Sequence, residues 1–285
     1  VDSYGTAIVV DGNQLLLTPL EKALVPPPMA AATLSLPTPI SDIVVDGTHS
    51  SDGETIFAAI LSDGKIAIFS GRDASANSMV GGYSPPTLRA LAPLPEEAKT
   101  WRSWCIVHND KPNQVHCIAA QAGSRYTSER LIHFTVSWSN DDTKTSDARV
   151  EVTKDLSLEN RLLAAVPWSD DPRGVLLELI DGELFEYSVE DEAIILLEDS
   201  GALLEPCPWI AGLKHPAVIG SGDLHRQRLV IGMSERGRLF CHDLLLSDSV
   251  SSFILDCKHA FLCFATSESR CELRFIPLTG LIDFD

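Results

Sequence analysis

The sequence predicts an all-β fold assembled from repeated antiparallel hairpins. Short runs of alternating apolar and polar residues occur along the whole chain, whereas helical periodicity is scarce. Turn residues separate nearly every pair of runs, as expected for strands joined by tight connections. One phrase also recurs: LIDGELFEYS at 179–188 has counterparts in LSDGKIAIFS at 61–70, SERGRLFCHD at 234–243 and, more faintly, VDGNQLLLTP at 10–19.

The repeated phrase predicts a tight hairpin turn. Asp-Gly between alternating apolar runs favours a primed turn, which needs positive φ at its centre. We therefore expect positive φ at Gly64 and Gly182. Taking the second residue of each turn, the hairpins fall at six places: Gly12, Gly64, Ser124, Gly182, Gly237 and Ser269.

The spacing of these turns favours a β-propeller. Neighbouring turns lie roughly 50–60 residues apart, except for a last interval of about 30, and a four-stranded blade takes roughly 40–50 residues. An up-and-down barrel would place its hairpins closer together and more evenly. A β-sandwich is the other alternative, and it does not readily accommodate so many blade-length periods. No tryptophan precedes an aspartate and no Gly-His opens a blade. We predict one degenerate, WD-repeat-like propeller of six or seven blades over residues 1–285, as a fragment of a longer chain.

The predicted strands follow one another in order, each an alternating or β-branched run bounded by turn residues. A short helix is expected at 94–101, LPEEAKTW. The strands are expected at 5–10, 14–20, 55–61, 65–70, 114–121, 130–138, 174–180, 183–189, 228–234, 238–245, 251–256, 260–267 and 271–278.

Three segments interrupt the strand pattern. Val25, Pro26, Pro27 and Pro28 form a stiff polyproline II stretch, suited to contact a partner or to act as a strap between blades. Residues 71–95 are rich in Gly, Ser, Ala and Pro, and residues 139–148 are polar and acidic. We expect both of these to be mobile loops.

Composition limits the functions available to the chain. The 285 residues carry a net charge of −18, which disfavours binding to the phosphate backbone of nucleic acids and to anionic membranes. No apolar run reaches about 18 residues, and the N-terminal residues do not read as a signal peptide. Seven cysteines, several of them within apolar strands, indicate a reducing compartment. We expect a cytoplasmic protein, with the nucleus as a second location, and seven free thiols.

One group of residues has the composition of a zinc site. Cys105, His108, His116 and Cys117 lie within CIVHNDKPNQVHC. However, neighbouring residues on a strand point to opposite faces, which separates His116 from Cys117. We interpret Cys105 and Cys117 as packed core thiols, and we expect neither a metal nor a cofactor.

For each catalytic motif that the sequence suggests, a structural explanation of the same residues is stronger. The glycine-rich GSGDLH at 220–225 lacks the lysine and following helix of a phosphate loop. No Gly-x-Ser-x-Gly elbow occurs, and SSDGETIF at 50–57 lacks the tryptophan of a sialidase Asp-box. The acidic pairs Asp141–Asp142 and Asp170–Asp171 are expected to be solvated turns rather than an acid/base pair. We therefore predict that the chain is not an enzyme.

A basic group occurs near the end of the chain. Arg226 and Arg228 precede a predicted strand, whereas Arg236 and Arg238 flank its hairpin turn. The two pairs should lie at opposite ends of one blade, so we interpret them as solvated or ion-paired side chains. Their role stays open.

Three stretches have wording that is specific beyond the strand pattern: residues 9–45, which contain Val-Pro-Pro-Pro, residues 174–187 and residues 229–269. They resemble the largest subunit of the Elongator complex, the IKAP family. The resemblance is thin over about 71–155. It implies the second of two N-terminal propellers in a scaffold that holds a catalytic acetyltransferase subunit, which modifies the wobble uridine of transfer RNA.

The resemblance also implies the partners of the chain. These are other Elongator subunits, including the catalytic one, and the rest of its own chain. Contact with transfer RNA would be weak or indirect, no membrane is involved, and no catalytic residue is carried over. The alternatives are a propeller of another large scaffold or trafficking complex, and a propeller hydrolase.

Overall fold

The structure is a computed structural model, and its contacts divide the chain into two compact units. Unit 1 comprises Val1–Gln121 and Ile132–Asp155, and unit 2 comprises Ala122–Leu131 and Leu156–Asp285. Each unit is described by itself. The residues described are 6–20, 30–45, 54–72, 85–96, 101–108, 111, 113–121, 123, 129–139, 148–171, 173–197, 203–214, 228–257, 259–268 and 271–282.

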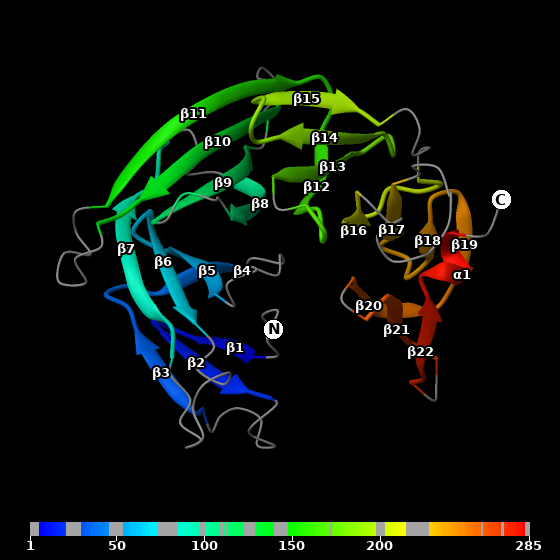
Figure 1. Cartoon of the computed structure of the whole chain (residues 1–285), viewed down its shortest axis with the longest axis horizontal. Coiled ribbons are helices and arrows are strands. Elements are labelled where there is room, and N and C mark those ends of the chain that lie inside the picture. Colours follow the sequence, from blue (N-terminus) through cyan, green and yellow to red (C-terminus); the bar gives the residue numbers. More distant parts are fainter. Residues whose placement is uncertain are drawn as a thin grey trace. The chain divides into compact units, whose positions relative to one another are not determined.

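The chain is an all-β, six-bladed β-propeller, in which each blade is one sheet of strands consecutive in the sequence (Figure 1). This confirms the predicted fold class, whereas the WD-repeat character stays a prediction. The first blade of unit 1 is formed by β1 (Thr6–Asp11), β2 (Gln14–Pro19) and β3 (Ala32–Ser35), and the second by β4 (Ile40–Val45), β5 (Glu54–Leu61), β6 (Lys65–Arg72) and β7 (Thr87–Pro93). The third blade is formed by β8 (Trp101–His108), β9 (Gln114–Gln121), β10 (Glu129–Ser137) and β11 (Arg149–Leu158), and most of the residues of this blade belong to unit 1.

Unit 2 contains three blades built in the same way. Its strands are β12 (Leu162–Pro167), β13 (Gly174–Leu179), β14 (Leu184–Ser188) and β15 (Ala193–Leu196); β16 (Trp209–Leu213), β17 (Leu229–Met233), β18 (Leu239–Cys241) and β19 (Leu244–Ser247); and β20 (Val250–Asp256), β21 (Phe261–Thr266) and β22 (Leu273–Pro277). A single turn of helix, α1 (Thr279–Ile282), follows the last strand and was not predicted. Within the described residues no helix is long and apolar enough to cross a membrane.

The predicted glycine turns join neighbouring strands of one blade. Gly12 joins β1 to β2, Gly64 joins β5 to β6, Gly182 joins β13 to β14, and Gly237 joins β17 to β18. Their φ angles are 61°, 77°, 86° and 74°, which confirms the positive φ expected at Gly64 and Gly182. A side chain at Gly237 would also place its Cβ 2.7 Å from the carbonyl oxygen of Val250. Residues 124 and 269 lie outside the described residues.

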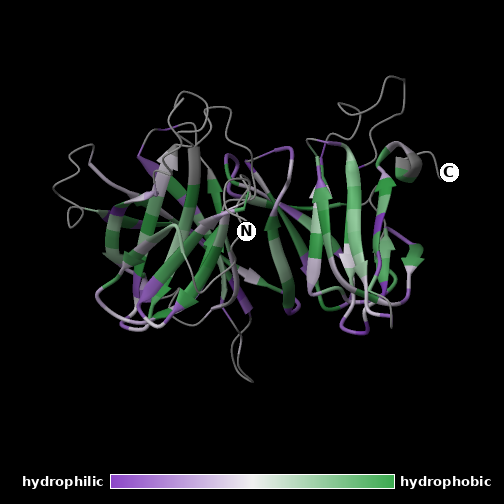
Figure 2. Ribbon diagram, turned by 90° about the horizontal axis from the view of Figure 1, so that it is seen from below, coloured by the Kyte–Doolittle hydropathy of each residue, from purple (hydrophilic) through white to green (hydrophobic). Residues whose placement is uncertain are grey.

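Unit 1 buries both faces of the sheet β4–β7. On β5, Ile56 and Ile60 pack with residues of the sheet β8–β11, whereas Phe57 and Leu61 pack toward β2 and the residues after β3. Phe57 stacks on Phe69 of β6 with ring centroids 4.8 Å apart. Because successive strand residues face opposite ways, a sheet buried on both faces reads as the continuous apolar run seen here. Figure 2 shows such hydrophobic residues concentrated in the strands.

Unit 2 buries both faces of the sheet β16–β19 in the same manner. Val230 of β17 packs with Leu176 of β13, whereas Ile231 packs with Leu262 of β21. The fully buried Trp168, in the turn after β12, lies in the first of these clusters. Stacked faces therefore supply the core of each unit, as blades require.

Two sequence-based expectations need correction. Residues 71–95 are not one loop, because β6 extends to Arg72 and β7 occupies Thr87–Pro93; residues 73–84 lie outside the described residues. The helix expected at 94–101 is also wrong at its end, because Trp101 opens strand β8 and Trp104 on the same strand is buried in the core of unit 1. Of the loop expected at 139–148, residues 140–147 are outside the described residues, and the single-domain expectation stays a prediction.

Candidate functional site

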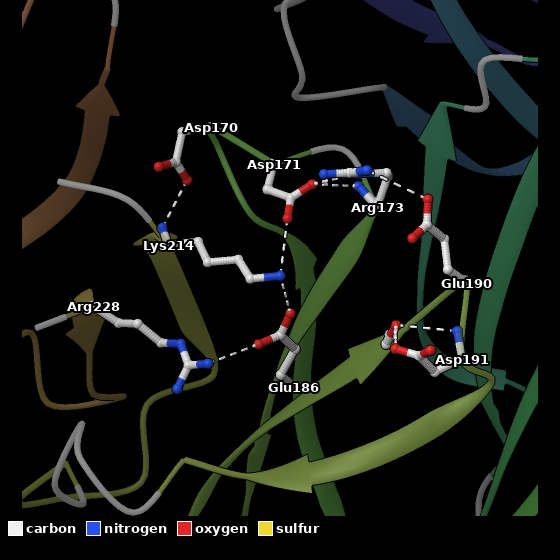
Figure 3. A network of polar contacts seen from close by, with 9 residues as sticks. Asp170, Asp171, Arg173, Glu186, Glu190, Asp191, Lys214 and Arg228 are labelled. Atoms are coloured by element: carbon white, nitrogen blue, oxygen red, sulfur yellow. Dashed lines mark hydrogen bonds and ion pairs between the residues drawn. The ribbon is translucent and has the colours of Figure 1, made fainter. Parts of the chain in front are cut away.

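Charged side chains from two blades of unit 2 meet in one network (Figure 3). Asp170 and Asp171 lie in the turn between β12 and β13, and Glu186 lies within β14, opposite Leu176 of β13. Lys214 directly follows β16, and Arg228 directly precedes β17. The network therefore joins the β12–β15 blade to the β16–β19 blade at the ends of their strands.

Lys214 is the centre of the network. Its Nζ donates to Glu186 Oε1 at 2.5 Å and to Asp171 Oδ2 at 2.9 Å. Its backbone nitrogen donates to Asp170 Oδ1 at 2.7 Å. The second oxygen of Glu186 lies 3.3 Å from Arg228 Nη2. The side chains of Asp171 and Glu186 are only 6% and 4% exposed, so both carboxylates are buried beside cations.

Asp171 is held from its own turn as well. The backbone nitrogen of Arg173 donates to Asp171 Oδ1 at 3.0 Å, and Arg173 Nε lies 3.4 Å from the same oxygen. Burial by itself would raise the pKa of Asp171, but the hydrogen bonds from Lys214 and Arg173 outweigh it and lower the pKa. Asp171 is therefore ionised at neutral pH, and the sequence-based expectation of a solvated turn is wrong for this residue. Asp141 and Asp142 lie outside the described residues.

The chemistry of the network is that of a structural joint. Burial alone would lower the pKa of Lys214, but hydrogen bonds to Glu186 and Asp171 outweigh burial and raise it. A nucleophilic lysine needs the opposite shift, because only the neutral amine attacks. A protonated Lys214 instead compensates part of the charge of the two buried carboxylates, and Arg173 and Arg228 compensate the rest. Removal of one partner would weaken the pairing of a buried charge.

Trp168 fixes the position of the turn that carries the two aspartates. Its backbone nitrogen donates to Gly174 O at 3.1 Å, and Ser169 N donates to Gly212 O at 2.9 Å. A Cβ added at Gly174 would lie 2.7 Å from Trp168 Cδ1, and one added at Gly212 would lie 2.5 Å from Cζ3. The indole thus occupies the space that side chains at positions 174 and 212 would need.

A third buried carboxyl group, Glu178, lies on the same face of the β12–β15 blade as Glu186. It pairs in register with Leu184, two residues from Glu186 along β14, and it is 0% exposed. Its Oε1 accepts from Cys207 N at 2.7 Å, and its Oε2 has no hydrogen-bond partner among the described residues. Burial raises the pKa of Glu178 to about 8, so this carboxyl group is largely protonated at neutral pH.

Sequence reasoning missed both glutamates, although Glu186 lies in the phrase that defined the repeat and Glu178 directly precedes it. In LLELIDGELFEYS each glutamate follows an apolar residue, as an outward-facing residue of a half-buried strand would. The signal that could have revealed Glu178 is the run GVLLEL, in which all six residues of β13 are buried. A polar residue in such a run lies inside the protein.

A shallow groove lies beside the hairpin turns of unit 2. It has a volume of about 430 Å³. Arg238, next to the β17–β18 turn, forms an ion pair with the lining residue Glu205. The groove combines apolar side chains with charges of both signs, and its lining residues are Arg161, Leu163, Ile180, Glu205, Pro206, Pro208, Ser234, Glu235 and Arg236.

The four residues with the composition of a zinc site do not form a ligand set within the described residues. Cys105 and Cys117 are buried core thiols, 4% and 0% exposed, as predicted. Burial raises the pKa of Cys117. The Nδ1 atom of His116 instead lies 2.7 Å from Nε2 of His133 on β10. The side chain of His108 lies outside the described residues. Among the described residues, no three His, Cys, Asp or Glu side chains are grouped to hold a metal ion.

The remaining sequence-based candidates have mixed outcomes. Arg228 and Arg238 form ion pairs with Glu186 and Glu205, which confirms the ion-paired interpretation for these two. Arg236 lines the groove, and Arg226 lies outside the described residues. The polyproline segment, Val25 to Pro28, also lies outside them, as do residues 50–53 and 220–225. All seven cysteines are free thiols.

The blades define the chain as a β-propeller. The described charge network links two of these blades within unit 2. The family comparison is more specific. The chain matches the family described as ELP1 N-terminal second beta-propeller over residues 9–285, and it belongs to that family.

Curated relatives agree with this assignment. The chain is 24% identical to Elongator complex protein 1 of Arabidopsis thaliana over 278 residues, covering 87% of this chain and 19% of that protein. The protein of the same name from Schizosaccharomyces pombe is 24% identical over 282 residues, covering 99% of this chain and 19% of its own length. The chain thus spans about a fifth of the relatives it matches.

Solved structures show the same fold at low identity. BBS1N, crystallised in complex with ARL6DN, has a TM-score of 0.56 and 12% identity, covering 99% of this chain and 78% of that chain. Chaetomium thermophilum Raptor has a TM-score of 0.53 and 11% identity, covering 98% of this chain and 23% of its own. These two likenesses concern the fold alone.

Proposed function

We propose that this chain is a non-catalytic scaffold module of the Elongator complex, which supports modification of the wobble uridine of transfer RNA through protein–protein contacts. The family match over residues 9–285 carries this proposal. The described charge network supports it, because Asp171 and Glu186 are ion-paired within unit 2 with Lys214, Arg173 and Arg228. The partners are the other Elongator subunits, including the catalytic acetyltransferase subunit, and the rest of the same chain.

The groove of unit 2 is the surface that we assign to contact with another subunit. Two exposed arginines, Arg161 and Arg236, flank apolar Leu163 and Ile180 there. This combination suits a segment of a partner that carries both carboxylates and apolar side chains, because ion pairs steer the encounter and apolar burial stabilises the complex. The polyproline segment at residues 25–28 stays a second predicted contact or strap.

Charge reversal in the full-length subunit tests the assignment. We expect Arg161→Glu with Arg236→Glu to reduce co-purification of the catalytic subunit and the level of wobble-uridine modification. The matched control reverses Arg149 and Lys111, which are exposed outside the groove. Both double variants change the net charge equally, so loss in both would indicate a general charge effect and not a groove contact.

Deletion of the whole module tests the scaffold role separately from the groove. We expect a full-length subunit that lacks residues 9–285 to assemble poorly with the catalytic subunit. Normal assembly and modification would refute the scaffold proposal, whereas a normal groove variant alone would refute only the groove. Direct transfer RNA binding should be weak and salt-sensitive because the chain carries a net charge of −18. We place the protein in the cytoplasm, with the nucleus as a second compartment.

A further inference from the structure

One wall of the groove in unit 2 is a short segment, residues 205–208, which we call the wall segment. It lies between β15 and β16 in the sequence, and all of its residues except Cys207 line the groove. Cys207 is 0% exposed and belongs to the core between the two blades. It passes close over β17, because a Cβ added at Gly232 would lie 2.9 Å from Cys207 Sγ. The shape of the groove therefore depends on where this segment lies.

Few polar contacts hold the wall segment to the blades. The residues on either side of Cys207 are prolines, which have no N–H group, so Cys207 N is the backbone donor between them. It donates to Glu178 Oε1 at 2.7 Å. Among the described residues, the other polar contact between the segment and the blades is the ion pair of Glu205 with Arg238. Glu178 therefore holds the middle of the segment on its buried side.

The surroundings of Glu178 suit a protonated carboxyl group and not a carboxylate. Glu178 is 0% exposed, and its Oε2 has no hydrogen-bond partner among the described residues. Its neighbours in register are the apolar Ala164 of β12 and Leu184 of β14. A buried carboxylate without a cation is costly, so ionisation favours any arrangement in which water reaches the group. Movement of the wall segment would provide such an arrangement.

The other titratable groups around Glu178 do not supply a cation. Glu186, on the same face of the blade, is ion-paired with Lys214 and Arg228. The carboxylate of the wall segment has its own ion pair, as described above. Burial raises the pKa of Cys207 to about 12, and the nearby Glu178 adds to this effect, so the thiol stays neutral. Among the residues that the structure describes, none forms an ion pair with Glu178.

We propose that Glu178 controls the groove: its protonated carboxyl group holds the wall segment against the blades, and its ionisation opens the segment and removes this wall. On opening, water reaches both carboxyl oxygens and the proton passes to solvent. The pKa of Glu178 is about 8 in the closed form and would return toward its ordinary value of 4.5 in the open form. The closed form is thus favoured at low pH and loses this advantage as pH rises toward 8.

The effect on a partner rests on the proposed function. A partner segment that contacts the arginines of the groove needs both of its walls, so it would bind the closed form and oppose opening. The opening itself depends on no partner.

Thiol labelling of the native full-length subunit tests the opening. Cys207 reacts only when the wall segment moves, whereas Cys241, another buried thiol of unit 2, reports unfolding of its blade. We expect Cys207 to be labelled well before Cys241, as read by mass spectrometry. Dividing the Cys207 rate by its rate in Glu178→Gln removes the pH dependence of the thiol itself, and this ratio should rise roughly five- to tenfold between pH 6 and pH 7.

Three results of the labelling would each overturn the inference. They are equal rates at Cys207 and Cys241, no labelling of Cys207, and a ratio between parent and Glu178→Gln that does not change with pH.

A second measurement separates this inference from the proposed function. Saturating purified catalytic subunit should slow labelling of Cys207 at least tenfold in the parent and not in Arg161→Glu with Arg236→Glu. If that double variant loses co-purification but the partner never protects Cys207, the groove contact holds and its control by Glu178 is refuted. If the double variant co-purifies normally, the groove contact is refuted, while the ratio at Cys207 still decides whether Glu178 opens the wall segment.

Discussion

Replacing Glu178 by glutamine should remove a pH dependence from the stability of unit 2. The pKa of Glu178 is raised to about 8 in the folded state, against an ordinary value of 4.5. Between these two values the folded protein binds one proton more than the unfolded chain, so stability falls as pH rises. Each pKa unit corresponds to about 1.4 kcal/mol. The residue should therefore make unit 2 roughly 2–3 kcal/mol less stable at pH 7 than at pH 5.

Glutamine keeps the acceptor that Cys207 N uses, and it cannot ionise. The free energy of unfolding of the variant, relative to that of the parent protein, should therefore rise by about 2–3 kcal/mol when the pH is raised from 5 to 7. Its absolute stability at pH 5 should change little, because one buried polar atom lacks a partner in both side chains.

Pulse labelling of the Cys207 thiol during urea unfolding measures this effect, because Cys207 is fully buried beside Glu178. The exposed Glu183, changed to glutamine, is the matched control. We expect the pH slope to disappear in Glu178→Gln and to persist in Glu183→Gln. Equal slopes in the parent and in both variants would refute the protonated state of Glu178.

Three further predictions follow from buried contacts. Lys214→Met should lower the free energy of unfolding of unit 2 by about 2–3 kcal/mol, because it removes the cation shared by two buried carboxylates and leaves them only the longer contacts with Arg173 and Arg228; a change below roughly 0.5 kcal/mol in urea unfolding would contradict the network. Gly212→Ala should cost about 1–3 kcal/mol by overpacking Trp168, and a neutral effect on the thermal midpoint would contradict the close contact. Burial, with a smaller effect of His116, lowers the pKa of His133 from 6.5 to about 4, so unit 1 should lose stability as pH falls from about 6.5 toward 4. His133→Gln should reduce that acid sensitivity in hydrogen exchange of β10, and an unchanged profile would refute it.

The repeat of the fold could be predicted from the sequence because its signal is local. The glycines of the Asp-Gly and Arg-Gly turns have positive φ, and the alternating runs beside them pair as antiparallel strands, as at β5 with β6 and β13 with β14. The primed turn expected at Asp-Gly is wrong, because these two registers are centred on Asp63 and Asp181 and neither aspartate has positive φ. The outer strand β11 was missed although Val150, Val152, Leu156 and Leu158 alternate along it, because Lys154 interrupts the alternation and half of the residues are exposed. The helix expected at 94–101 is wrong at Trp101 because packing against the core of unit 1 outweighs local helix propensity there.

The site could not be predicted in the same way, because its residues are distant in the sequence. Asp171, Glu186 and Lys214 come from separate strands and turns, and no local pattern states that a carboxylate will meet a cation. Adjacent aspartates such as Asp170 and Asp171 usually lie in solvated turns. The expectation of a solvated turn followed from this general rule, and it is wrong for the buried Asp171. The pairing of His116 with His133 was hidden for the same reason.

The close packing of Trp168 against Gly174 and Gly212 has a consequence for how this blade can change during evolution. Neither glycine can acquire a side chain while the indole keeps its place, since the added Cβ atoms would lie 2.7 Å and 2.5 Å from it. The three positions are therefore expected to vary together across the family, with a smaller residue at 168 wherever 174 or 212 is larger. In the laboratory, Trp168→Phe should tolerate Gly212→Ala better than the parent protein does, so the second substitution should be partly compensated by the first.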